Sequence, residues 1–100
     1  MYARITPFKM KRDKVDAAKR KAEEMRPRIL ALPGMKHFTL AMDEDGKGYV
    51  VSLVESREIS EKNKEKVKAL WGELKDFLET MPKPEGYEVV HDWQAAEAHA

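Results

Sequence analysis

Three side chains in predicted strands have the chemistry for proton transfer or anion binding. His37 and His91 could act as general bases near neutral pH, and Arg4 could orient an oxyanion, so these three are the predicted catalytic residues. His91 and Asp92 are adjacent on a strand, so their side chains point to opposite faces and cannot pair with each other. Each histidine also has a structural explanation: His91 as a partly buried side chain bonded to a neighbour, and His37 as a polar residue of an edge strand.

A second group of residues would supply a small-molecule pocket with a few polar contacts among apolar walls, which is the usual composition of such sites. The predicted ligand-binding residues are Thr6, Phe8, Thr39, Ser52, Trp71 and Trp93. The two tryptophans could stack on an aromatic substrate. Trp71 also lies on an apolar helical stripe, where tryptophan usually anchors a core, and the polar strand residues could instead face water or the rim of a dimer.

Composition argues against several other kinds of site. The chain has no cysteine, which excludes disulfides, thiolate metal sites and a cysteine nucleophile, and which fits a reducing, cytoplasmic location. Its three histidines show no H-x-x-x-H spacing, so we predict neither a metal nor a cofactor. No apolar run approaches the roughly 20 residues that span a bilayer, so we predict no membrane partner.

Nucleic acid is not an expected partner either. The segment 9–28 holds nine lysines or arginines against four acids, but these charges flank an apolar seam as solvated side chains with buried stems do. The net charge of the whole chain is only +1. No RNP-like aromatic motif occurs on the predicted strands, although RNA-recognition modules share the same element order. An RNA-binding monomer is therefore the least favoured of the functions considered.

The elements that must position these residues follow from the hydrophobic periods, which run two, helical, two, two, helical, two. The predicted strands are 2–8, 35–43, 49–54 and 87–93. The first helix begins near Asp13 and is ended by Pro33 and Gly34; the second begins at Ser56 or Ser60 and carries an apolar face as far as Met81. This order, β-α-β-β-α-β, predicts an α+β, ferredoxin-like domain over residues 1–94, with a flexible or loosely helical tail at 95–100.

Right-handed crossovers place the first and third strands in the centre of an antiparallel four-stranded sheet, with both helices on one face. We predict that the helix-facing residues include Ala3, Ile5, Phe38, Leu40 and Met42. The opposite face would carry Arg4, Thr6, Phe8, His37, Thr39, Val89, His91 and Trp93. Such an apolar face with a few polar groups indicates a partner, and the simplest partner is a second copy of the chain, with a cavity between the two sheets.

Four segments carry a resemblance to a known family. They are the opening strand 2–6, the helix end Leu32-Pro33-Gly34, the strand 49–54 running through Glu55-Ser56 into a helix, and the closing His91-Asp92-Trp93. Over 2–93 the chain resembles the dimeric α/β-barrel superfamily, and within it the antibiotic-biosynthesis-monooxygenase-like proteins. The resemblance implies a ferredoxin-like subunit, a homodimer, and a pocket between sheet and helices.

The superfamily hosts cofactor-free oxygenation of polyphenols, haem degradation and lactone isomerisation, so the resemblance implies a fold without fixing one reaction. The first strand lacks the Asn of the haem-degrading relatives, and Val54 stands where a tryptophan is often found, so haem degradation is not expected. We predict a small-molecule-binding protein, with cofactor-independent monooxygenase or isomerase activity on a small aromatic compound as one form. The alternative is a non-catalytic homodimer with a ligand-binding or structural role.

Overall fold

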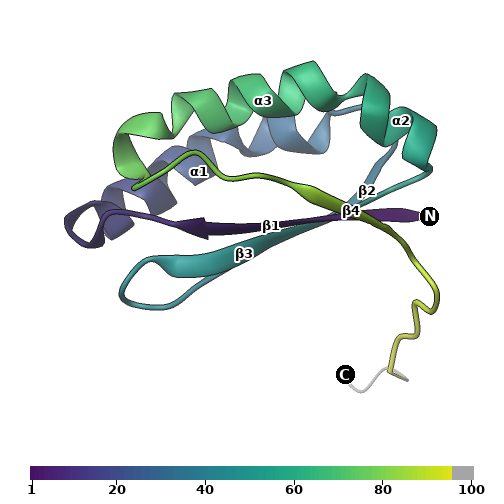
Figure 1. The fold of residues 1–100 in the computed structure, drawn as a ribbon, viewed down its shortest axis with the longest axis horizontal. Helices are drawn as coiled ribbons and strands as arrows, with labels where there is room; N and C mark the ends of the chain where they lie inside the picture. Colours follow the sequence, from purple (N-terminus) through teal and green to yellow (C-terminus); the bar gives the residue numbers. More distant parts are fainter. Residues whose placement is uncertain (96–100) are drawn as a thin grey trace.

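The computed structural model describes residues 1–95, and the tail predicted over 95–100 lies almost entirely outside them. Four strands form one antiparallel sheet in the order β2-β3-β1-β4. Figure 1 shows this sheet nearly edge-on, with the helices above it. Their bounds are β1 Tyr2–Lys9, β2 Met35–Met42, β3 Lys47–Val54 and β4 Glu85–Glu88. The helices are α1 Val15–Leu30, α2 Arg57–Lys62 and α3 Lys64–Glu73, with short 3-10 turns at Arg12–Lys14 and Lys75–Phe77.

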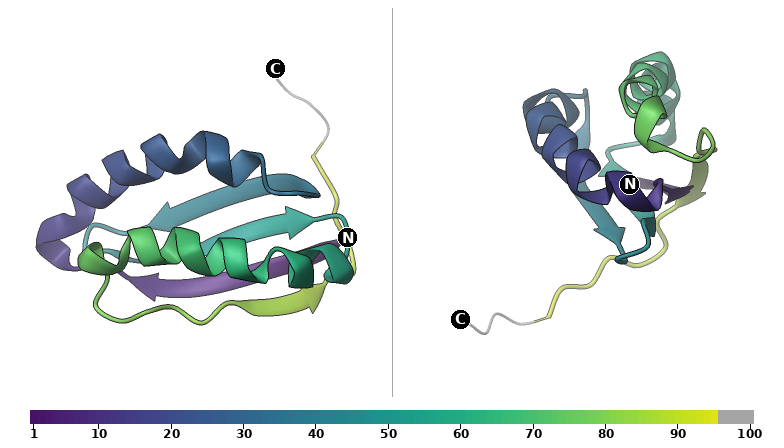
Figure 2. Two further views of the ribbon diagram at one scale, coloured as in Figure 1. Left: turned by 90° about the horizontal axis from the view of Figure 1, so that it is seen from above. Right: turned by 90° about the vertical axis from the view of Figure 1, so that its left-hand side faces the viewer.

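All three helices lie over the same face of the sheet, and the other face carries none of them (Figure 2). The strand order has β1 and β3 in the centre and β2 and β4 at the edges. The predicted α+β, ferredoxin-like fold is therefore confirmed. None of the helices in residues 1–95 is long and apolar enough to cross a bilayer.

The first helix follows its apolar seam closely. Val15, Ala18, Met25 and Ile29 are buried at spacings of three, seven and four residues, so they form one stripe over the sheet. Pro27 lies inside the helix on its exposed side, where a missing N–H leaves no buried carbonyl without a partner. After the helix, Gly34 takes φ +73°, and a Cβ there would lie 2.7 Å from Ile59 Cγ2, so glycine suits this position.

The second helical region differs from the prediction of one helix reaching Met81. Ser56 caps α2 by accepting a hydrogen bond from the Ile59 N–H at 3.2 Å. The helix is interrupted at Asn63, whose side-chain amide donates to the Pro33 carbonyl at 2.8 Å and ties the junction to the end of α1. Helix α3 then ends at Glu73, and Met81 is exposed.

The predicted faces of the sheet are correct for β2 and wrong for β1. Phe38, Leu40 and Met42 pack against the helix-side core as expected. In β1, however, it is Arg4, Thr6 and Phe8 that point towards the helices, because Arg4 pairs with Ser52 and Thr6 with Val50 on that face. Ala3 and Ile5 therefore lie on the uncovered face.

The last strand is also shorter and earlier than predicted. It spans Glu85–Glu88 rather than 87–93, because β4 pairs with β1 and the first residue of β1 is Tyr2, opposite Glu88. The Val89 N–H still donates to the Met1 carbonyl at 3.1 Å, and the ladder ends there. His91 and Trp93 follow as exposed residues outside the sheet, with Trp93 84% exposed.

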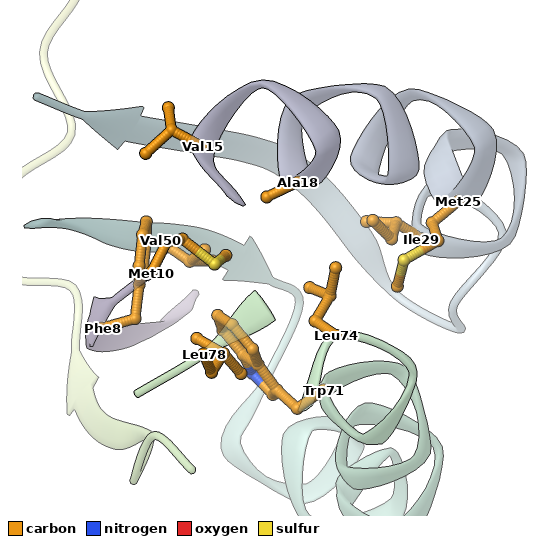
Figure 3. Close-up of a cluster of buried hydrophobic side chains, with 10 residues drawn as sticks. All are labelled: Phe8, Met10, Val15, Ala18, Met25, Ile29, Val50, Trp71, Leu74 and Leu78. Atoms are coloured by element: carbon orange, nitrogen blue, oxygen red, sulfur yellow. The ribbon is translucent and has the colours of Figure 1, made fainter. Parts of the chain in front are cut away.

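The core lies between the helices and the sheet (Figure 3). Phe8, Met10 and Leu78 gather at one end, where Met10 and Leu78 form an isolated antiparallel bridge. Trp71 reaches from α3 to this group, with its ring centroid 6.0 Å from that of Phe8 and the planes tilted by 48°. The aromatic pair therefore joins α3 to β1 at this end of the domain.

The turn between β2 and β3 depends on a glycine. Gly46 has φ +91°, and its carbonyl accepts the Met10 N–H at 2.8 Å. We expect Gly46→Ala to lower the free energy of unfolding by about 2 kcal/mol, because a Cβ would be strained at this φ and would lie 2.7 Å from the Met10 carbonyl oxygen. The matched control is Gly72→Ala, since Gly72 is in α3 with open space around it; helix propensity should make that variant slightly more stable in urea denaturation. Equal effects at the two sites would contradict the prediction.

Candidate functional site

A cavity of about 450 Å³ lies between the helices and the sheet. This volume is within the range of small-molecule sites. Its walls are mainly apolar and come from α1, α3, β2 and β3. Away from the opening, the apolar lining comprises Met10, Ala18, Ala22, Met25, Ile29, Leu32, Met35, Phe38, Leu40, Met42, Val50, Val67, Leu70, Trp71 and Leu74. Four of these residues are methionines, whose flexible thioether side chains adapt readily to irregular shapes.

The sheet side of the cavity carries a small polar group. Arg4 and Thr6 come from β1, and Ser52 comes from β3 directly opposite Arg4. Because the three residues are on the two central strands, the sheet's hydrogen bonds hold their backbones in place on both sides. A cation and two hydroxyl groups are thus presented to an otherwise apolar space, and such groups can fix the orientation of a ligand.

Arg4 is only partly satisfied by the protein. Its Nη1 donates to the hydroxyl oxygen of Ser60 in α2 at 2.9 Å, and Ser60 is completely buried. Its Nε is buried with no hydrogen-bond partner. Within residues 1–95 no carboxylate forms an ion pair with this guanidinium. A buried donor without a partner is uncommon in proteins and is a frequent mark of a functional position.

The exposed residues of the lining show where the cavity opens to solvent. Glu23, Arg26 and Leu30 form one edge on α1, and Lys36 and His37 form the other on β2. The opening therefore lies along the edge strand, where the Met35–His37 segment of β2 has an irregular register against β3. Lys36 pairs with Glu55 across 3.5 Å.

The structure brings together some of the predicted site residues and separates the others. Arg4, Thr6, Ser52 and Trp71 all line the cavity. His37 lies at the opening, but its Nε2 is 3.1 Å from Thr39 Oγ1, and both side chains are exposed. Phe8 packs behind Trp71 and is not part of the lining.

His91 and Trp93 are away from the cavity, with their rings 4.7 Å apart in the exposed segment after β4. The cavity lies on the helix side of the sheet, where the resemblance predicts a pocket. The second predicted cavity, between the sheets of two copies, stays a prediction. The four lining methionines were not among the predicted ligand-binding residues, although the apolar periodicity of α1 and β2 does mark two of them, Met25 and Met42. Met35 reaches the same side through the irregular register between Met35 and His37.

An ion pair joins α1 to α3. Arg28 of α1 donates from Nη2 to Glu73 Oε1 of α3 at 2.8 Å, and Lys21 Nζ lies 3.6 Å from the same oxygen. The hydrogen bond from Arg28 holds the pKa of the Glu73 carboxylate below its ordinary value, and Glu73 raises the pKa of Arg28 in return. The pair is exposed, so we expect a small contribution to stability.

This contribution should depend on pH. Because the folded-state pKa of Glu73 is lowered, the pair stabilises the protein above the ordinary glutamate value of 4.5 and is lost as the pH falls through the folded-state pKa. We expect Glu73→Gln to lower the melting temperature slightly at neutral pH and to match the wild type in strong acid. Glu24→Gln on the exposed side of α1 is the control, because Glu24 forms no ion pair within residues 1–95. A difference for Glu73→Gln that persists unchanged in acid would contradict this assignment.

Together, the sheet order, the helices on one face and the cavity beneath them define an α+β subunit of the ferredoxin-like class. No protein-family model and no curated protein matches the chain. Solved structures do share its fold. One is described as "Putative antibiotic biosynthesis monooxygenase from Nitrosomonas europaea", with a TM-score of 0.75 and 19% identity over 91% of this chain and 100% of that one.

Two further structures extend the comparison. A structure described as a "putative antibiotic biosynthesis monooxygenase from Deinococcus radiodurans" has a TM-score of 0.76 and 11% identity over 97% of this chain and 100% of that chain. A protein of unknown function from Nitrosomonas europaea has a TM-score of 0.77 and 14% identity over 96% and 95%. The chain thus has the fold of the antibiotic-biosynthesis-monooxygenase-like structures along nearly its whole length, and the predicted resemblance is confirmed as a likeness of fold.

Proposed function

We propose that this protein binds a small, largely apolar molecule, aromatic in its main part, in the cavity between its helices and its sheet. The observation that carries the proposal is the cavity itself: about 450 Å³ of apolar space with one cation and two hydroxyl groups on one wall. A filled core would leave no such space, because protein interiors are normally packed as densely as organic crystals.

Native mass spectrometry of the protein as purified is the first test, because a retained small molecule would add its mass to the chain. Thermal stabilisation by 2-naphthoate and by its neutral analogue 2-naphthamide is the second, since any ligand that binds only the folded state raises the melting temperature. A protein that carries no adduct and is stabilised by neither compound would overturn the proposal.

A cofactor-free, monooxygenase-like reaction on the bound aromatic molecule is the second candidate function. It is favoured by the fold shared with structures described as "putative antibiotic biosynthesis monooxygenase". In this reaction the substrate itself supplies the electrons, one oxygen atom enters the product and the other leaves as water. Arg4 would stabilise negative charge on the substrate. Within residues 1–95 the only histidine or carboxylate residues of the lining are His37 and Glu23 at the opening, which favours binding without turnover. Incorporation of labelled O2 into a product would decide for the enzyme.

The uncovered face of the sheet supports a homodimer. Ile5, Val51 and Leu53 are half-buried there, and Tyr49 and Tyr87 are each about half exposed. The charged residues that alternate onto this face, Lys9, Lys47 and Glu85, each stand at the end of a strand, so the central area is uncharged. A patch of this kind can pair with itself about a two-fold axis.

We expect Leu53→Glu to shift the protein from dimer to monomer, because two carboxylates would be buried near each other in a symmetric interface. The mass in solution, from light scattering after size exclusion, measures the change. Ala69→Glu adds the same charge to the exposed side of α3 and should leave the mass unchanged. A wild-type protein that is already monomeric at high concentration would contradict the homodimer.

A further inference from the structure

The positive charge of Arg4 in the cavity lining indicates which class of ligand the cavity binds. Arg4 is half-buried and its Nε is enclosed by protein, so its charge is partly withdrawn from water without a counter-charge, which is unfavourable. Arg4 meets only the neutral hydroxyl of Ser60, and no carboxylate within residues 1–95 pairs with it. The charge nevertheless lies in the lining of an apolar cavity, on a central strand, where an apolar side chain would be expected to pack better.

We propose that the ligand is an apolar monocarboxylate whose carboxylate group is bound by Arg4, with Ser52 and Thr6 beside it. This inference rests on the proposed binding function of the cavity and narrows it to one chemical class. Arginine carries five N–H donors in a planar fork that suits a carboxylate. One nitrogen, Nη1, is engaged with Ser60, and Nε is enclosed by protein atoms. The remaining N–H groups of the Nη atoms are the ones that meet the ligand.

The charge balance favours a carboxylate over a phosphate. Arg4 is the only charged residue that lines the cavity away from its opening, within residues 1–95. One cation neutralises one carboxylate, whereas a phosphate monoester would bring close to two negative charges and require further donors. The two hydroxyl groups can complete the hydrogen bonds of a carboxylate, and the methionine, leucine and tryptophan side chains provide the apolar surface for the remainder of the molecule.

The preference follows from the fixed position of the donor. The bond to the buried Ser60 holds the guanidinium between β1 and α2 before any ligand enters. Little side-chain entropy is then lost on binding, which strengthens a charge-assisted hydrogen bond. A neutral amide of the same shape can accept one of these bonds but leaves the positive charge uncompensated.

The test compares 2-naphthoate with 2-naphthamide by calorimetry at neutral pH, because the two differ only in the charged group. We expect the carboxylate to bind the wild type at least tenfold more tightly, about 1.4 kcal/mol. Arg4→Met should remove this preference by weakening the carboxylate and sparing the amide. Ser60→Ala should reduce the preference without abolishing it, because the guanidinium keeps its charge but loses the bond that holds it in position.

Arg4→Lys is the second variant, in case Arg4→Met does not fold. It keeps the positive charge at this position, so it should still bind the carboxylate more tightly than the amide. If Arg4→Met does not fold, the wild-type comparison and Arg4→Lys decide the matter. Equal or tighter binding of the amide to the wild type would overturn the monocarboxylate inference and leave the binding function standing. Failure of both compounds to bind at concentrations up to about 1 mM would overturn the binding function as well.

Discussion

Replacing Trp71 by alanine is expected to lower the free energy of unfolding by about 3–5 kcal/mol, the largest effect of any single substitution considered for this chain. Trp71 is 9% exposed, packs on Phe8 and lines the cavity, so its removal deletes core contacts and enlarges an existing empty space. A domain of this size has a total stability of roughly 5–15 kcal/mol, so the variant should be partly unfolded near physiological temperature. Urea denaturation followed by far-UV circular dichroism measures the loss.

The matched control is Trp93→Ala, which deletes the same side chain from an exposed position after β4. Substitutions at such positions usually change stability by no more than about 0.5 kcal/mol. A loss at Trp93 comparable with that at Trp71 would contradict the expectation that the cost at Trp71 comes from its burial in the core.

Replacing Ala22 by phenylalanine is expected to weaken the binding of 2-naphthoate at least tenfold while leaving stability unchanged or slightly raised. Ala22 lies on the seam of α1 and lines the cavity, so a ring at this position occupies the space that a ligand needs. Filling an apolar cavity also adds contacts that the wild type lacks. Calorimetric titration and a thermal melt of the same sample measure the two quantities.

Ala69→Phe is the control, because Ala69 is on the exposed side of α3 and does not line the cavity. Its affinity for 2-naphthoate should equal that of the wild type. Undiminished binding by Ala22→Phe would place the ligand elsewhere, and a large drop in its melting temperature would mean that the cavity is too narrow at this point to accept a ring.

The element order and sheet topology could be predicted from the hydrophobic periods, because each period is set by local geometry. The faces of β1 could not be predicted from Ala3 and Ile5 alone. Both faces of this strand are apolar in part, and the helix side also carries the polar residues of the cavity, so hydrophobicity does not separate them. The better signal is further along the strand: Phe8 and Met10 are buried at 6% and 2% exposure and share the phase of Arg4 and Thr6.

The two corrections at the ends of elements have non-local causes. Tyr87-Glu88-Val89-Val90-His91 alternates like a strand, but a strand needs a neighbour, and β4 pairs with β1 only as far as Tyr2 and Glu88, with one further hydrogen bond from Val89 to Met1. The second helical region is broken at Asn63 by a hydrogen bond to Pro33, thirty residues away. Neither the extent of the β1–β4 pairing nor the Asn63–Pro33 hydrogen bond can be recognised from the local sequence. The prediction of His91 as a catalytic residue depended on a strand that reached residue 93. Arg4 was predicted on the face of the sheet opposite the helices, but it lies on the helix side and lines the cavity there.

The methionines of the cavity lining make the affinity for a ligand sensitive to an oxidising medium. Met10 and Met25 are each only 2% exposed, but Met35 and Met42 stand half-buried in β2, at the edge of the sheet. Conversion of a thioether to a sulfoxide turns an apolar, flexible side chain into a polar one. Among the lining methionines, peroxide would therefore reach Met35 and Met42 first, and the affinity for an apolar ligand would decline before the fold is lost.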